Sequence, residues 1–129
     1  MTKPQRLESL YVANLALLAV HEIDSAYWHE WQLFGIPGGI QLFLVVNFTL
    51  LLPFLHGLVR LARDPRSGAP YGIALSIAGV AAFGIHAAFL LQGHPAFRLP
   101  ASLAILGLSL CTSLALVSSS LGIVRRSSR

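Results

Sequence analysis

The residues of this sequence that could do chemistry are gathered in one short part of an apolar stretch. His21, Glu22 and Asp24 lie within four residues of one another, and His29 and Glu30 follow soon after. An ionisable group inside a membrane costs roughly 2.5–3.5 kcal/mol on insertion scales, so such groups face a protein interior or a cavity. Three of them this close together need partners, which makes them the leading candidates for a site.

Helical spacing divides this cluster into two faces. His21, Asp24 and Ser25 are three or four residues apart and share one face of a helix. Glu22 lies about 100° round from His21 and shares its face with His29, seven residues later. One helix therefore cannot direct all of these side chains at a single atom.

A metal site is one interpretation of these residues. Two histidines and a carboxylate can hold zinc or iron and leave a fourth position open to water. We expect His21 and Asp24, with His86 from a later apolar stretch, to be the ligands. Glu22 would then act as a general base, and the protein would be a metal-dependent membrane enzyme of the hydrolase kind.

Two other interpretations remain open. His21 and His86 could pair with the carboxylates in a buried hydrogen-bond network that holds the helices in register. The same groups could also handle protons or ions, as part of a transporter or an accessory protein, because ionisable groups inside a membrane mark function without specifying it. Asn47 belongs to the predicted polar site, and His29 would lie at its outer end.

Several sharper motifs do not fit. The zinc-protease pattern His-Glu-x-x-His fails because position 25 is Ser25. A di-iron site needs carboxylates from all the helices of a bundle, and the three later apolar stretches contain none. A haem between His21 and His86 would have the minimal pair of ligands, but no further motif supports it.

The rest of the chain consists of apolar stretches separated by short breaks. Hydrophobic residues make up 55% of the 129 residues and charged residues only 11%, whereas a soluble domain carries about 25% charged residues. About 20 apolar residues cross a bilayer as a helix, and the breaks are rich in Gly and Pro. We predict one domain, residues 1–129, with four spans at about 10–33, 40–61, 71–91 and 101–124.

The basic residues predict the orientation. If both termini lie on one side, Arg98 alone lies opposite, and the excess of basic residues marks the cytoplasmic side. We therefore expect both termini in the cytoplasm and the protein in the cell (inner) membrane. Nucleic acid is not an expected partner, because the basic residues form short clusters between apolar runs. Those grouped on the cytoplasmic side are Lys3, Arg6, Arg60, Arg63, Arg66, Arg125, Arg126 and Arg129.

Depth along these spans selects the residues that can meet. Counting about 1.5 Å of rise per residue from the outer interface, the polar side chains of four spans fall in one belt in the outer half of the bilayer. This belt contains His21, Asp24, Asn47, His86 and Ser109.

The segments from His21 to Trp31 and from Phe34 to Gln41 resemble a family of small four-span bacterial membrane proteins of unknown function. The first segment is also distantly similar to the His-x-x-Glu-Glu group of membrane proteins. It departs from that pattern, because Asp24 replaces the first Glu and Ser25 the second. The resemblance covers roughly the first 60 residues. It implies a bacterial cell-membrane protein and supplies no activity.

The sequence thus predicts an all-α fold, an integral membrane four-helix bundle with both termini inside. The lipid bilayer is the expected partner, and a homo-oligomer stays open. The cofactor is undetermined between zinc, iron and none.

Overall fold

The computed structural model describes residues 3–127 of the chain. These residues form five helices and no strand. Four of the helices are long and one is a single turn. They are α1 (Lys3–Tyr27), α2 (Glu30–Leu33), α3 (Gly39–Arg63), α4 (Pro65–Leu91) and α5 (Pro100–Ser127).

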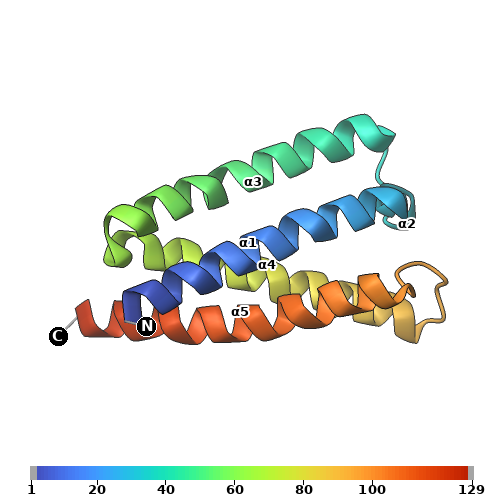
Figure 1. Cartoon of the computed structure of the whole chain (residues 1–129). Helices are drawn as coiled ribbons and strands as arrows, with labels where there is room; N and C mark the ends of the chain where they lie inside the picture. Colours follow the sequence, from blue (N-terminus) through green and yellow to red (C-terminus); the bar gives the residue numbers. More distant parts are fainter. Residues whose placement is uncertain (1–2, 128–129) are drawn as a thin grey trace.

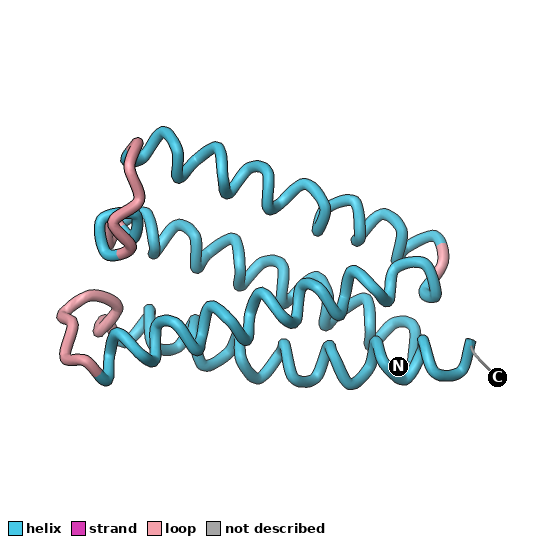
Figure 2. Tube along the Cα trace, turned by 180° about the vertical axis from the view of Figure 1, so that it is seen from behind, coloured by secondary structure: helices cyan, strands magenta, loops and turns pink. Residues whose placement is uncertain are grey.

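The four long helices lie side by side along one common direction (Figure 1). Both ends of the chain and the turn between α3 and α4 lie at one end of the molecule, and the other two connections lie at the opposite end (Figure 2). Helix α1 packs against α5, α3 and α4, and α3 packs against α4. The short helix α2 therefore lies at the end opposite to the termini.

Within the described residues, three helices are long and apolar enough to cross a membrane: α3, α4 and α5. Helix α1 has a similar length, 25 residues, but His21, Glu22 and Asp24 interrupt its apolar sequence. The side chains of α3 are largely exposed; Val45 and Phe48, for example, are 62% and 66% exposed. Because a protein in water does not leave such an apolar face uncovered, this surface fits a lipid environment.

The turn between α3 and α4 has strong local determinants. Asp64 is the N-cap of α4, and its side chain accepts hydrogen bonds from the backbone N–H groups of Arg66 and Ser67 at 3.1 and 3.0 Å. Pro65 follows in the first turn, where its missing N–H is tolerated. The bond from the Arg66 N–H, with that from Ser67, holds the pKa of the exposed Asp64 carboxyl below its usual range.

The first apolar stretch does not continue as one helix to residue 33. Helix α1 ends at Tyr27, and His29 adopts a left-handed conformation, with φ 53°. The chain then forms α2 and reaches α3 through a connection in which Gly35 and Gly38 have φ 63° and 95°, values that favour glycine. This early end to α1 allows α2 to turn back toward the other helices.

The apolar core lies toward the end of the molecule that holds the termini. It consists of side chains from all four long helices, with Tyr11 at its centre donating a hydrogen bond of 2.8 Å to the Phe54 carbonyl. Helices α4 and α5 approach closely at Gly72 and Gly79, where an added Cβ would collide with Ser120 and Ser113. The buried members of the core are Leu7, Tyr11, Leu15, Leu18, Phe54, Leu61, Leu75 and Leu116.

Candidate functional site

His86 occupies a buried position on α4, near the end of the molecule that carries α2. Its side chain is 1% exposed, and its Nδ1 lies 2.7 Å from the Ala82 carbonyl oxygen, one turn earlier. Because a carbonyl only accepts hydrogen bonds, Nδ1 carries the proton and donates it. In the neutral ring, Nε2 then presents a lone pair. Metal-binding histidines are commonly oriented by a hydrogen bond of this kind.

His21 on α1 contacts this ring edge to face, with the ring centroids 4.6 Å apart. Its side chain is 4% exposed, and its Nδ1 is buried without a hydrogen-bond partner. The Nε2 atom of His86 is also buried without one. A buried polar atom left unpaired costs about 1–3 kcal/mol. A metal ion or a hydrogen-bond partner at these two nitrogens would remove that cost.

Glu30 on α2 completes the group. Its Oε1 lies 3.6 Å from His86 Nε2. His21, Glu30 and His86 each offer one ligand atom, and these three atoms lie within 4.8 Å of one another. A carboxylate oxygen and an imidazole lone pair are both acceptors, so a positive charge is required between them, either a metal ion or a proton.

The group is of the right kind for a small transition-metal ion. Zinc bonds of 2.0–2.2 Å in tetrahedral geometry place ligand atoms ~3.3 Å apart. Binding would therefore draw the three side chains slightly together. The three ligands come from α1, α2 and α4, so they also tie together three separate elements.

Phe97 closes this group from the connection between α4 and α5. Its ring meets the His86 ring edge to face at 4.2 Å and lies 6.0 Å from Trp28. Phe97 is fully buried although its φ is +63°, a conformation that costs a residue with a side chain of order 1 kcal/mol or more. The packing of its ring compensates for this backbone strain and keeps water from His86.

A pocket of about 340 Å³ lies beside the group, between α1, α2, α3 and α4. Glu22 and Asn47 line it together with His21, Glu30 and His86. Glu22 is close enough to Asn47 and Glu30 to interact with both. The structure thus places Glu22 and Asn47 with His21, although helical spacing had assigned Glu22 to a different face.

Asp24 and Ser25 lie apart from that pocket. Ser102 on α5 donates a hydrogen bond of 2.9 Å to Asp24 Oδ1. Asp24 is therefore not one of the three side chains whose ligand atoms converge. Ser25 is fully buried, and its hydroxyl has no hydrogen-bond partner. Asp24 thus joins α1 to α5, as Asn14 does nearer the core by donating to Ser113 at 2.8 Å.

The remaining polar residues of the predicted site lie at its margin. His29 is exposed and contacts Trp31 edge to face at 5.2 Å. Ser109 is buried on α5 and does not line the pocket. Neither residue belongs to the converging group.

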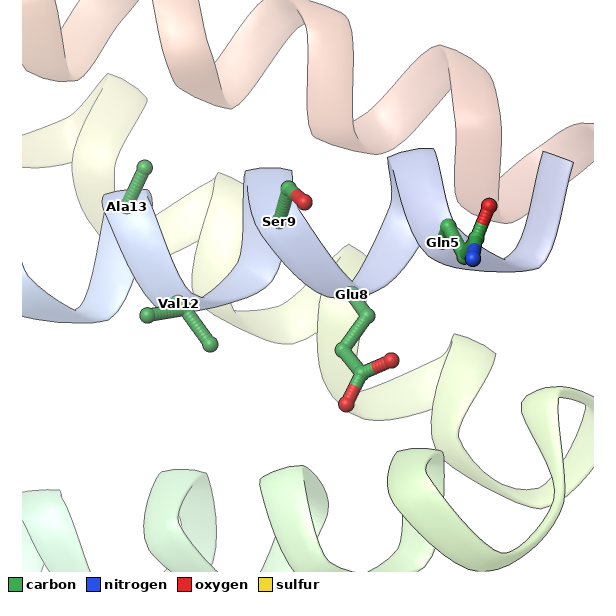
Figure 3. A pocket seen from close by; sticks show the side chains of 5 residues that line it. All are labelled: Gln5, Glu8, Ser9, Val12 and Ala13. Atoms are coloured by element: carbon green, nitrogen blue, oxygen red, sulfur yellow. The ribbon is translucent and has the colours of Figure 1, made fainter. Parts of the chain in front are cut away.

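A larger hollow of about 640 Å³ lies along the first half of α1, and Figure 3 shows its lining. Its five residues all belong to one helix, and Glu8 and Val12 point away from Ala13. Polar groups from different elements do not converge there. The pocket beside His86 is therefore the better site.

Two residues at this site were not assigned to it from the sequence. Glu30 was named after the main cluster, near the outer end of a first span that was expected to run to about residue 33. No Gly or Pro lies at the end of α1 at Tyr27. The turn that directs Glu30 inward therefore could not be predicted from a helix-breaking residue. Phe97 lies in a connection rich in Gly and Pro, and only the fold places its ring against His86.

One protein family matches most of the chain. Residues 7–122 match a family of unknown function, DUF6713. No curated protein and no solved structure matches the chain. A function must therefore be argued from the geometry.

Proposed function

The chain belongs to the family of unknown function DUF6713, and we propose that it is a small integral membrane protein that binds one transition-metal ion, zinc or iron. The proposed ligands are His21, Glu30 and His86. The observation that carries this proposal is the meeting of three buried or half-buried ligand atoms from three elements, within 4.8 Å of one another. Two of these atoms belong to histidines with an unpartnered buried nitrogen.

The proposal includes four spans with both termini in the cytoplasm. Three helices have the length and composition to cross a membrane. The 25 residues of α1 are about 37 Å long at 1.5 Å per residue, which exceeds the ~30 Å of a hydrocarbon core. Helix α1 also runs beside α5 (Figure 1), and its Glu22 and Asp24 side chains are half-buried.

The distribution of basic residues supports this orientation. Arg60 and Arg63 lie in the last turn of α3, and Arg125 and Arg126 lie in the last turn of α5. These turns are at the end of the molecule that holds the termini (Figure 1). Arg98 lies in the connection at the opposite end. Arg129, which the sequence also assigned to the cytoplasmic side, lies outside the described residues.

The proposed metal would have an open coordination position. Three protein ligands leave room for a fourth, as in catalytic zinc sites, and the pocket beside the group supplies the space. Glu22 borders the same pocket and could take a proton from a metal-bound water. This arrangement is that of a metal-dependent hydrolase, which is the chemical activity we attach to the proposal.

Proton handling is the second candidate, and it rests on the same three atoms. The 3.6 Å contact between His86 Nε2 and Glu30 Oε1 could hold a proton instead of a metal. This alternative predicts a metal-free protein whose proton is shared by the pair. The hydrogen bond from Ser102 to Asp24 supports a structural role for Asp24 under either candidate.

Metal analysis of the purified protein distinguishes these candidates. We expect about one zinc or iron per chain, as a single three-ligand site would hold, and loss of that metal in His21→Ala and in His86→Ala. Asp24→Asn is the matched control, because it changes a neighbouring acid on α1 and should keep the metal. A metal-free wild type, under conditions in which added zinc does not bind, would refute the proposal and favour proton handling. Loss of metal in Asp24→Asn alone would instead restore Asp24 as a ligand.

A further inference from the structure

The pocket beside the proposed metal site is lined mainly by apolar side chains. Besides the five polar residues, its lining is apolar and comes from all four surrounding elements. Three alanines of α4 line one side of the pocket with small side chains, and larger side chains of α3 also line it. The apolar lining residues are Leu18, Trp31, Phe34, Ile36, Phe43, Val46, Leu50, Ala78, Ala81, Ala82 and Ile85.

On the side of the apolar core, Leu18 and Ala78 continue the pocket beyond its polar groups. Leu18 is one turn of α1 from His21, and Ala78 is about 12 Å along α4 from His86 at 1.5 Å per residue. The direction from His86 to Ala78 runs toward the apolar core. A bound molecule with its polar head at the histidines would thus place its chain deeper in the protein.

Charge and size narrow the class of molecule. Glu22 and Glu30 border the pocket, and no Lys or Arg is among its lining residues. A divalent metal would offset the two carboxylate charges, so the occupied pocket would favour a neutral head over a charged one. A volume of about 340 Å³ is at the lower end of the range for small-molecule sites, about 300–1,000 Å³. There is space for a single chain but not for the two chains of a bilayer phospholipid.

We infer that the pocket binds a neutral single-chain amphiphile, an acyl ester, with its chain between α3 and α4 and its ester oxygen at the level of His21 and His86. This inference rests on the proposed function, since the metal would be the partner of the ester oxygen. It adds the class of molecule that the site receives. The exposed apolar surface of α3 allows such a molecule to enter from the bilayer.

Trp31 provides a reporter, because it lines the pocket and is 9% exposed. The chain has only two tryptophans, so the variant Trp28→Phe leaves Trp31 as the sole one. The experiment measures quenching of its fluorescence by a monoacylglycerol brominated along its chain, in nanodiscs of unbrominated phosphatidylcholine. Brominated fatty acid, a brominated alkyl-trimethylammonium and brominated phosphatidylcholine serve as comparison probes.

We expect saturable quenching by the monoacylglycerol. In the same background, Ala81→Phe, which places a ring at the pocket wall, should weaken the apparent affinity by about tenfold or more, which corresponds to 1.4 kcal/mol. Ala104→Phe is the matched control on an exposed position of α5 and should leave quenching unchanged. Metal content is measured on every sample and should be equal in both variants.

Quenching that does not saturate, or that is the same in Ala81→Phe and Ala104→Phe, would overturn the inference. Equal quenching by the anionic, cationic or two-chain probe would overturn the assigned class of ligand. If the wild type holds no metal but the monoacylglycerol still gives saturable quenching that Ala81→Phe abolishes, the proposed metal function fails and the pocket assignment stands. If metal binds and quenching fails, the reverse holds.

Discussion

At the scale of single residues, the hydrogen bond from His86 to the Ala82 carbonyl decides the chemistry of the site. It assigns the proton to Nδ1 and leaves Nε2 facing a carboxylate oxygen of Glu30 at 3.6 Å. Two acceptors that face each other in a buried environment repel unless a cation or a proton lies between them. His21 adds a third ligand atom within 4.8 Å of these two.

Glu30→Gln tests the role of this carboxylate directly. The substitution keeps the shape of the side chain but removes its charge, so we expect zinc affinity to fall more than about 100-fold, beyond the 10–100-fold typical of residues that only orient a ligand. Competition with a chromophoric chelator measures the affinity. Glu22→Gln is the control: it removes an acid from the same pocket and should change the affinity much less. Equal losses in both variants would mean that Glu30 acts through charge alone.

Part of this site could be predicted from residue types and spacing. One pocket is bordered by His21, Glu22, Asn47 and His86. Depth along the predicted spans had placed His21, Asn47 and His86 at a similar level in the membrane. The third member of the converging group, Glu30, could not be found in this way. Asp24 has the helical spacing needed to bind a metal together with His21, but in the structure it accepts a hydrogen bond from Ser102. Glu30 reaches the site only because the backbone turns at His29.

At the scale of helices, the lengths and breaks of the apolar stretches predicted the long elements, whereas small local interactions set their ends. Asp64 and Pro65 start α4 six residues before the predicted span at Tyr71. Glycines decide how closely helices pack. Gly79 faces Ser113 on α5, whereas Gly84, less than two turns later, has no atom within 4 Å of an added Cβ.

Gly79 and Gly84 of α4 should respond in opposite directions to the same change. Gly79→Ala introduces a collision with Ser113, and we expect it to destabilise the protein by about 1–3 kcal/mol, as overpacking does. Gly84→Ala meets no neighbour and should stabilise the helix by up to about 1 kcal/mol. Reversible unfolding in mixed micelles measures both. Changes of equal sign and size would contradict the close packing of α4 and α5.

The N-cap of α4 predicts a dependence of stability on pH. Hydrogen bonds from the Arg66 and Ser67 N–H groups lower the pKa of Asp64 in the folded protein. Its contribution is therefore fully present above the unfolded pKa of about 3.9 and is lost as pH falls through the lower folded value. We expect the difference in Tm between wild type and Asp64→Ala to stay constant from neutral pH to about pH 4 and to shrink below it. Asp64→Asn, whose amide oxygen still accepts a hydrogen bond, should lose less Tm than Asp64→Ala at neutral pH, and its difference from wild type should also shrink on acidification. A difference that grows on acidification would contradict this assignment.

At the scale of the whole molecule, the apolar core and the polar site occupy different halves. The core around Tyr11 lies toward the end that holds the termini, and the converging residues lie toward the end that holds α2. If the termini are cytoplasmic, the proposed metal site lies in the outer half of the membrane. The proposed function therefore depends on orientation as well as on ligands.

Cysteine labelling tests that orientation. Cys111 is the sole cysteine of the chain, so a Cys111→Ala background allows one new thiol at a time. Ala62→Cys in the last turn of α3 and Gln92→Cys after α4 are both at exposed positions, at opposite ends of the molecule. We expect a membrane-impermeant maleimide to label position 92 in right-side-out vesicles and position 62 in inverted vesicles. The opposite pattern would place the termini outside.

X-ray absorption at the zinc edge of the zinc-loaded protein is the most direct test of the central claim. We predict two imidazole ligands and one carboxylate oxygen, with metal–ligand distances of about 2.0–2.2 Å, and one light ligand more from water or substrate. In His86→Ala the imidazole signal should fall to one or zinc should be lost, and in Asp24→Asn the spectrum should not change. A spectrum without imidazole scattering, or one that depends on Asp24 and not on His86, would contradict a metal site formed by His21, Glu30 and His86.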